Sequence, residues 1–391
     1  MSKPLISIII PTRNRQQYAC AAVKNILSFN SDLQVIVQDN SDDESLRELL
    51  NHEIHDSKII YHYKKEKIAG VDNYNIAAHY ATGEYFCAIG DDDTVLPHIV
   101  DCAKWMKKNN IDAVLPSKSL YYFWPSNDKA KHSAYLGIGD FSGYVQVCDP
   151  KEGVIALLRQ GGQDYLTLSM VGSYHGLVKM SRMCEVKEIT GRFYGGLSPD
   201  MYSAICLSLL PDMRFVKMDY PITLPGICNA STSAASDAGQ HIGLLNTAPH
   251  FDGLLEPYTW DSIVPEVYSV QTIWCETMIH ALRKMRRDDL IAKYFDKGQL
   301  INRLINDNKG HKEFLMQFLT EQDKLLLNEE ITSKKKNRIT SIIKYVFSVV
   351  MGRSKRIYNC NDIAQATQEV EKHLSKKYYA KAWERICSDI S

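Results

Sequence analysis

The sequence predicts an α/β protein, in which helices cover both faces of a mainly parallel sheet, with a helical extension toward the C-terminus. Short runs rich in β-branched residues alternate with segments of helical periodicity through the first 115 residues. These runs are mainly apolar, which is typical of strands buried on both faces. The chain has 391 residues, more than one compact domain usually needs, so further units are expected after the sheet.

The elements of this first part follow in a regular order. The run 6–10 ends at Pro11, and the segment 17–29 then has apolar residues spaced three and four apart, as on one face of a helix. The same alternation continues to residue 116. The expected strands are 6–10, 33–38, 58–63, 84–89 and 113–116, and the expected helices are 17–29, 45–50, 73–80 and 96–109.

After residue 116 the pattern is less regular. Residues 121–149 are predicted to form aromatic and polar loops, 152–159 and 199–210 helices, and 214–222 a strand. The stretch 225–243 is rich in Ala, Ser, Gly and Asn, which predicts a mobile loop. Residues 259–330 are expected to be largely helical. We therefore divide the chain at 1–115, 116–258, 259–330 and 331–391.

Composition narrows the class of protein. Apolar residues make up 45% and charged residues 24% of the chain, as in soluble globular proteins, and 46 basic residues balance 46 acidic ones. This balance argues against general binding of nucleic acid. The ten cysteines contain no C-x-x-C pair, which argues against a zinc site of paired thiolates. Several lie within apolar runs, which predicts buried, reduced thiols in a cytoplasmic protein. The first apolar run is too short for a signal peptide, and no segment has the roughly 20 apolar residues of a membrane span.

Polar side chains follow several of the predicted strands. Pro11, Thr12, Arg13 and Asn14 follow the first strand, Asp39 lies at the end of the second, and Asn73 opens a helix. Ligands of parallel sheets bind beyond the carboxyl ends of the strands, where these residues are expected to meet. Each group is also compatible with ordinary turn chemistry, because Asn, Asp and Ser favour turns and caps.

Three consecutive acids, Asp91, Asp92 and Asp93, follow the fourth strand. They would repel one another unless a cation or hydrogen-bond donors compensate for their charge. Mg²⁺ and Mn²⁺ take oxygen ligands and often bridge protein carboxylates to phosphate. The alternative is an acidic helix N-terminus, because a helix is predicted from residue 96.

The order of these motifs resembles glycosyltransferase family 2, an inverting family with the GT-A fold. The family's first strand ends in a P-T-x-N-R-like turn, its second in a V-x-D-N-S turn, and a G-E-Y stretch precedes its D-x-D motif. The resemblance is close over residues 4–115 and looser to about 225. One position departs from it, since Gly90 stands where the family commonly has the first acid of an L-D-x-D-D run. The matching residues are 11–15, 37–42 and 83–85.

The resemblance implies a role for each of these residues. Pro11, Thr12, Arg13, Asn14 and Asn73 would lie against the nucleotide of a nucleotide-sugar donor, which is expected to carry UDP. Asp39 would accept the imide N–H of uracil, and Asp91 would lie near the donor ribose. Asp92 would bind Mn²⁺ or Mg²⁺; alternatively, Asp91 and Asp93 themselves form the D-x-D pair. Asp93, the last acid of the triplet, is a further candidate ligand. Some relatives also use a late histidine near the metal, which makes His241 another.

An inverting transferase needs one carboxylate base to take the acceptor proton. Asp200 is the candidate, because Ser198 can cap a helix that begins at Pro199 and so hold Asp200 in the first turn. The family places its base at an acid opening such a helix. Asp200 is also compatible with a purely electrostatic role at the helix N-terminus. Asp164 is the second candidate.

Two regions suggest how the acceptor is met. The aromatic residues 121–124 are candidates for stacking against a sugar, although packing in the core explains them equally well. In the tail, apolar residues recur at helical spacing over 339–350, and basic residues flank them within 334–356. Such a segment either lies on an anionic membrane or packs on the protein. A membrane surface would suit a polyprenyl-diphosphate-linked acceptor.

Taken together, the sequence predicts a cytoplasmic, metal-dependent inverting glycosyltransferase that extends a glycan or lipid-linked acceptor in surface polysaccharide synthesis. A sugar-nucleotide nucleotidyltransferase is one alternative, but it would need a Gly-rich loop after the first strand, and residues 11–15 contain no glycine. A non-catalytic nucleotide-sugar-binding subunit is the other, favoured only by Gly90.

Overall fold

The structure is a computed structural model that describes residues 3–29, 31–126, 133–228, 242–327 and 354–388. Its main sheet has eight strands in the order β3-β2-β1-β4-β10-β6-β11-β9. β10 and β9 run antiparallel to their neighbours, and the remaining pairs are parallel. The predicted α/β class is therefore confirmed. The strands are β1 (Ile6–Thr12), β2 (Leu33–Asp39), β3 (Ile59–Tyr63), β4 (Tyr85–Ala88), β6 (Ala113–Pro116), β9 (Val145–Cys148), β10 (Leu177–Lys179) and β11 (Phe215–Met218).

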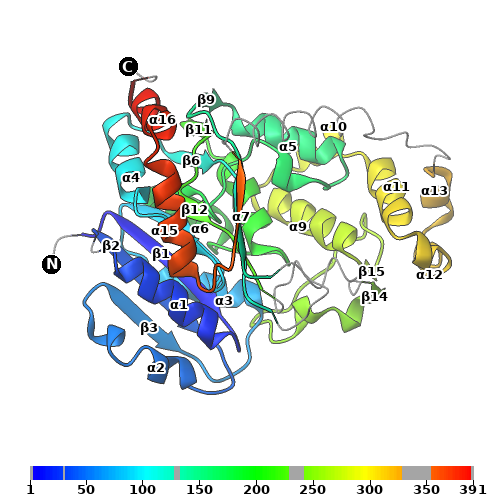
Figure 1. Ribbon diagram of the computed structural model, residues 1–391. Coiled ribbons are helices and arrows are strands. Elements are labelled where there is room, and N and C mark those ends of the chain that lie inside the picture. The colour runs from blue at the N-terminus through cyan, green and yellow to red at the C-terminus, as the bar shows by residue number, and fades with distance from the viewer. Residues whose placement is uncertain (1–2, 30, 127–132, 229–241, 328–353, 389–391) are drawn as a thin grey trace.

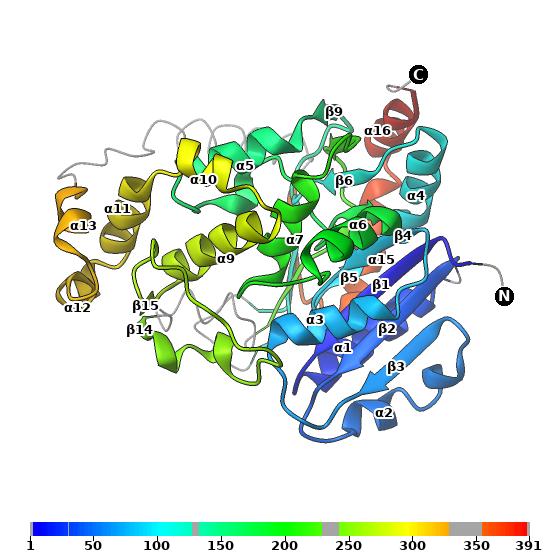
Figure 2. The same ribbon diagram turned by 180° about the vertical axis from the view of Figure 1, so that it is seen from behind.

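Both faces of the central strands of this sheet are buried. Side chains alternate along each strand, so each strand contributes to two cores. Ile8 and Ile10 belong to one apolar core, and Ile9 between them belongs to the other. The first core is covered by α1 (Gln16–Leu27) and α4 (Ile99–Lys108), and the second by α3 (Gly70–His79), α6 (Met180–Thr190) and α7 (Pro199–Ser208). Figures 1 and 2 show the two layers from opposite sides.

The prediction of loops over 121–149 is wrong. β7 (Leu120–Phe123) and β8 (Tyr135–Ile138) form a second sheet in the order β13-β7-β8-β16, with β13 (Gly226–Ile227) and β16 (Lys355–Tyr358). Aromatic residues suit strands, and β7 and β8 pair with each other, but their outer partners β13 and β16 come from about a hundred or more residues later, so local patterning misses the sheet. Shorter elements are α2 (Ser45–Leu49), β5 (Thr94–Val95), β12 (Thr223–Leu224), β14 (Gly243–Leu244) and β15 (Val267–Tyr268).

The helical extension is confirmed between residues 270 and 325. α9 packs against α7, and the other helices of this region follow it away from the sheet (Figure 2). Within the described residues, none of the helices combines the length and the apolar character that crossing a bilayer requires. The helices of this region are α9 (Val270–Lys284), α10 (Asp288–Tyr294), α11 (Lys297–Asp307), α12 (Lys312–Met316) and α13 (Glu321–Leu325), and α5 (Pro150–Arg159) lies earlier in the chain.

Residues 354–388 return to the N-terminal part of the chain. β16 pairs with β8, and α15 (Ile363–Leu374) packs on α1, with α16 (Lys377–Ser388) beyond it (Figure 1). Polar contacts anchor this docked segment: the side chain of Asn25 donates to Thr367 Oγ1, and the indole of Trp105 donates to the carbonyl of Ile386, each over 3.0 Å. The apolar segment 339–350 lies outside the described residues.

Glu276 on α9 is a buried acid in the second core. It accepts hydrogen bonds from the backbone N–H of Asp261 and the hydroxyl of Tyr258, but burial outweighs them and raises its pKa to about 7. The folded protein therefore binds this proton more tightly than the unfolded chain, and its stability falls as the pH rises from about 4.5 to 7. We expect Glu276→Gln to remove roughly 3 kcal/mol of this pH dependence, measured by urea denaturation at pH 5 and pH 8. An unchanged slope would contradict the assignment.

Candidate functional site

The polar ends of the parallel strands meet at one edge of the sheet, as the sequence predicts. Thr12 and Asp39 are opposite each other in the register of β1 and β2. The hydroxyl of Thr12 donates to Asp91 Oδ2 over 2.7 Å, which joins the exit of β1 to the exit of β4. The side chain of Asn73 donates to the carbonyls of Thr12 and Gln38, and its Oδ1 is buried without a hydrogen-bond partner among the described residues.

The three consecutive acids are buried, and one arginine lies between the first two. Asp91, Asp92 and Asp93 are 3%, 5% and 2% exposed. Arg15 Nη1 is 2.8 Å from Asp91 Oδ1, and Arg15 Nη2 is 2.7 Å from Asp92 Oδ2. This guanidinium is therefore the positive charge nearest to both carboxylates in the described part of the chain.

Asp93 has a set of partners of its own. Its Oδ2 accepts hydrogen bonds from the N–H of Gly90 and the hydroxyl of Tyr174, and lies 3.1 Å from His175 Nε2. Its Oδ1 accepts the N–H of Gly226. A Cβ at position 90 would lie 2.8 Å from Asp93 Oδ2, so the glycine leaves the space that this carboxylate fills.

The electrostatics separate the three acids. Burial raises the pKa of Asp91 to about 7, because it outweighs the attraction of Arg15. Burial and the charge of Asp93 raise the pKa of Asp92. Burial opposes ionisation of Asp93 as well, but His175 and the hydrogen-bond donors outweigh it and lower its pKa. Negative charge on Asp91 and Asp92 is therefore compensated only in part by the protein, whereas the charge of Asp93 is well compensated.

Trp124 and the segment 226–228 also hold Asp92 in place. The indole of Trp124 donates to the carbonyl of Asp92 over 2.8 Å, and the N–H of Cys228 donates to Asp92 Oδ2 over 3.3 Å. A Cβ at Gly226 would lie 1.8 Å from the carbonyl oxygen of Asp92, so only glycine fits this close approach. His241 lies outside the described residues.

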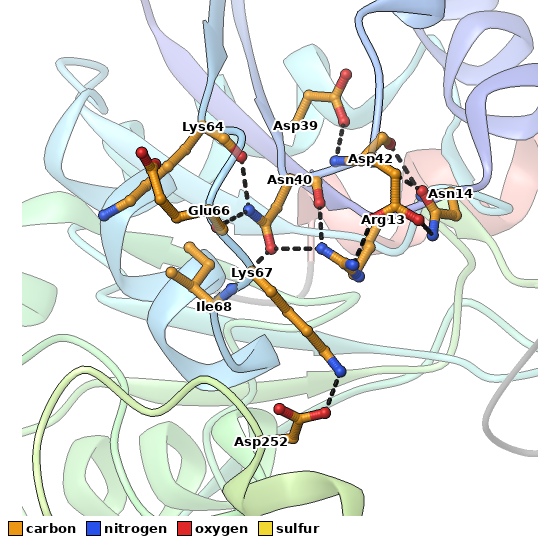
Figure 3. Close-up of polar contacts among 11 residues, drawn as sticks. Arg13, Asn14, Asp39, Asn40, Asp42, Lys64, Glu66, Lys67, Ile68 and Asp252 are labelled. Carbon is orange, nitrogen blue, oxygen red and sulfur yellow. Dashed lines mark hydrogen bonds and ion pairs between the residues drawn. The ribbon is translucent and has the colours of Figure 1, made fainter.

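Asn40 holds together the loops around the ends of β2 and β3 (Figure 3). Its amide donates to the carbonyls of Lys64 and Glu66 over 2.6 Å, and its Oδ1 accepts the N–H of Ile68 and Arg13 Nη1. Arg13 also pairs with Asp42, whose carboxylate and N–H bond the side chain of Asn14 in turn. Arg13 and Asn14, which the sequence predicts to contact the nucleotide-sugar, are thus held by hydrogen bonds within the loops around the site.

Asp39 is fully buried beside this network. Its Oδ1 accepts the N–H of Ser41 over 2.9 Å, and its Oδ2 accepts the hydroxyl of Tyr61 over 2.7 Å. Burial, together with Asp39, raises the pKa of Tyr61, which keeps the phenol protonated and donating. Pro11 lies within β1, next to Thr12.

A cavity of about 420 Å³ adjoins the acids. Tyr174 and His175, which hold Asp93, line it together with Asp200 and with Tyr121 from the predicted aromatic cluster. Tyr122, by contrast, is fully buried in the core. The cavity is therefore lined by the candidate base and by two residues that contact Asp93, while the three acids themselves are not part of its lining.

Asp200 lies in the first turn of α7, which begins at Pro199 as predicted. Ser198 Oγ donates to Asp200 Oδ1 over 2.7 Å, and the hydroxyl of Tyr165 donates to Asp200 Oδ2. Burial, followed by the charge of Asp200, raises the pKa of Tyr165 well above its usual range. The phenol therefore stays protonated, and Asp200 is the group of this pair that can accept a proton.

The second candidate base is placed differently. Asp164 has left-handed backbone dihedrals, with φ at 59°, and its Oδ1 lies 3.2 Å from Arg303 Nη2 on α11. It does not line the cavity that contains Asp200.

Sequence reasoning missed Arg15, Tyr165, Tyr174 and His175 as site residues. Arg15 is part of the turn motif 11–15, and a charged residue shortly after a strand is a usable signal. The other three lie on segments without a recognisable motif, and their roles depend on contacts with acids far away in the sequence.

The donor set fits a hard divalent cation. Carboxylate oxygens of Asp91 and Asp92 are the ligands that Mg²⁺ and Mn²⁺ prefer. In the described part of the chain, no three His, Cys, Asp or Glu side chains are grouped so as to hold a metal by themselves. Ions bound through one or two carboxylates usually take their remaining ligands from substrate phosphates and water.

Comparison with known proteins identifies relatives of the first part of the chain. The family model described as glycosyl transferase family 2 matches residues 7–159. The "Putative colanic acid biosynthesis glycosyl transferase WcaA" of Escherichia coli (strain K12) is 35% identical over 100 residues, which is 25% of this chain and 36% of that protein. The GalNAc(5)-diNAcBac-PP-undecaprenol beta-1,3-glucosyltransferase of Campylobacter jejuni is 34% identical over 96 residues, 24% of this chain and 31% of that protein. The match thus spans about a third of these relatives' own length.

Solved structures resemble the chain over more of its length. Residues 1–349 of S. aureus TarS in complex with UDP-GlcNAc align with a TM-score of 0.45 and 11% identity, over 94% of this chain and 91% of that one. The mannosyltransferase PcManGT of Pyrobaculum calidifontis, in complex with GDP-Man and Mn²⁺, aligns with a TM-score of 0.40 and 12% identity, over 100% and 88%.

Proposed function

We propose that this chain, whose residues 7–159 match glycosyl transferase family 2, transfers a sugar from a UDP-linked donor to an acceptor hydroxyl with inversion at the anomeric carbon. The observation that carries the proposal is the shared cavity. It is lined by Asp200, the candidate base, and by Tyr174 and His175, the residues that hold the acid triplet.

The donor side of the site is built from the strand ends. Asp39, at the end of β2, is the acceptor for the imide N–H of a uracil base, and Pro11, Thr12, Arg13, Asn14 and Asn73 form the walls around the nucleotide. Asp91 and Asp92 hold Mn²⁺ or Mg²⁺, which neutralises charge on the leaving diphosphate when it is bound. The four contacts of Asp93 favour a supporting role for it, behind the ligands.

On the acceptor side, Asp200 removes the proton of the attacking hydroxyl. Ser198 and Tyr165 orient its carboxylate through one hydrogen bond to each oxygen. The aromatic ring of Tyr121 lies in the cavity wall, where it suits the apolar face of a sugar.

The acceptor is a glycan, or a glycan on a polyprenyl diphosphate, in the synthesis of a surface polysaccharide at the cytoplasmic face of the membrane. The names of the two bacterial relatives support this, since they refer to colanic acid biosynthesis and to an undecaprenol-linked acceptor. Basic and apolar residues in 334–356 would attach the protein to the anionic surface.

A panel of nucleotide-sugars tests the proposal. Purified protein is incubated with each donor, a lipid-linked oligosaccharide and Mn²⁺, and released nucleoside diphosphate is measured together with the anomeric configuration of the product. We expect UDP release from one UDP-sugar, an inverted product, and loss of turnover with EDTA that Mn²⁺ restores. Pyrophosphate release would instead identify a nucleotidyltransferase. Binding of a UDP-sugar with no turnover on any acceptor would identify a non-catalytic subunit.

A further inference from the structure

Arg15 occupies the place between two carboxylates that a metal ion needs. Its two Nη atoms lie within 2.8 Å of Asp91 Oδ1 and Asp92 Oδ2, and its side chain is only 20% exposed. A guanidinium and a divalent cation both require these oxygens at contact distance, and two like charges cannot share them in a buried site without a large cost.

The contacts of Arg15 suggest that it can leave these acids. Its Nε is buried without a hydrogen-bond partner among the described residues, so both carboxylate contacts depend on the Nη atoms alone. The ring of Tyr18 lies 5.8 Å from the guanidinium carbon, and Cys228 Sγ lies 2.8 Å from Nη2. An aromatic face stabilises a guanidinium that has lost a carboxylate partner.

We propose that Arg15 is a built-in competitor of the metal ion: it pairs with Asp91 and Asp92 and is displaced when the divalent cation binds. The inference rests on the proposed function, because it takes Asp91 and Asp92 as the metal-binding acids. The measured affinity for the metal ion then depends on how much more strongly the two carboxylates bind the ion than they bind Arg15. Removing the guanidinium should therefore strengthen metal binding.

Binding of Mn²⁺ without donor or acceptor tests the proposal. The free Mn²⁺ signal in electron paramagnetic resonance gives Kd for wild type, Arg15→Gln and Arg15→Lys. We expect Kd to fall about tenfold or more in Arg15→Gln, in the usual range of coupling between sites. Arg15→Lys should be intermediate, because an ammonium is a point charge that cannot bridge two carboxylates with a planar fork.

Arg13→Gln is the matched control. Arg13 belongs to the same turn, but its ion pair is with Asp42 and it does not contact the acid triplet. The Arg13→Gln variant loses one nearby positive charge but keeps Arg15. Its Kd for Mn²⁺ should therefore stay within about twofold of wild type, well below the usual range of coupling between sites. An equal fall in Arg13→Gln and Arg15→Gln would reduce the effect to general charge and overturn the proposal, as would an unchanged Kd in Arg15→Gln.

Wild-type protein provides a second measurement that does not depend on a variant folding. With ¹⁵N-labelled arginine and diamagnetic Mg²⁺, the Nη signals of Arg15 should lose the restricted rotation of an ion pair as Mg²⁺ saturates. Signals that stay unchanged at saturation overturn the proposal. This readout is separate from turnover: a protein that releases UDP with Mn²⁺ but keeps Arg15 in place retains the proposed function and loses only this inference.

Discussion

Replacing Asp200 by asparagine is expected to lower kcat by about 10²–10⁴-fold, the usual contribution of a general base. Asparagine keeps the size of the side chain and can still accept the hydrogen bond of Tyr165 or Ser198. It cannot take a proton from the acceptor. The proposed donor site is at the ends of β1, β2 and β4, so the Kd for UDP should be unchanged. Single-turnover UDP release and calorimetric binding of UDP measure the two quantities separately.

Asp164→Asn is the comparison that makes this experiment decisive. Asp164 pairs with Arg303 and does not line the cavity, so its replacement should change kcat by no more than a few-fold. A large loss in Asp164→Asn with near-normal activity in Asp200→Asn would transfer the role of base to Asp164. Similar small effects in both variants would remove the base from this cavity altogether.

Ending the chain after residue 330 is expected to prevent folding. The docked segment 354–388 contributes fully buried apolar side chains to the core that covers α1 and α4. Burial of a large apolar side chain contributes about 1.5–3 kcal/mol, so their sum is on the order of 10 kcal/mol, comparable with the whole stability of a domain. The truncated protein should be insoluble, or should lack near-UV circular dichroism and bind ANS. The residues concerned include Ile363, Val370, Leu374, Tyr379 and Ile386.

A control for this truncation keeps 354–391 and replaces 331–350 by a Gly/Ser linker of equal length. We expect it to unfold at nearly the temperature of the full chain, because the docked segment is present. The same variant tests membrane attachment, since it loses the apolar and basic residues of 334–350 while retaining the docked segment. Flotation with anionic vesicles that is equal to that of the full chain would contradict attachment through 334–350. Cooperative unfolding of the 1–330 protein would contradict the role of the docked segment.

The first half of the sheet could be predicted because its signals are local. β1 and β2 are continuous apolar runs, and each ends in polar residues that meet at one edge. β10 escaped prediction because it has three residues and enters between β4 and β6 from more than sixty positions away. α15 has a regular apolar face, but nothing in its own sequence says that the face packs against α1. Pattern identifies an element more readily than its partner.

The candidate site follows the same division. The acid triplet and Asp200 stand next to recognisable strand and helix boundaries, so they could be singled out from sequence. Arg15 precedes Asp91 by 76 positions, and His175 follows Asp93 by 82, so their ion pairs are visible only in three dimensions. Gly90 illustrates the limit most clearly: the sequence presents it as a missing acid, whereas the structure shows that Asp93 fills the space beside it.

The return of residues 354–388 to β8 and α1 also has a consequence for synthesis on the ribosome. The core around α1 and α4 gains its last side chains only after α15 and α16 have left the exit tunnel, although α1 is made early. At ~5–20 residues per second, these helices stay partly uncovered for on the order of tens of seconds. During that time their exposed apolar side chains are a substrate for chaperones, and a premature stop before α15 leaves α1 without its outer cover.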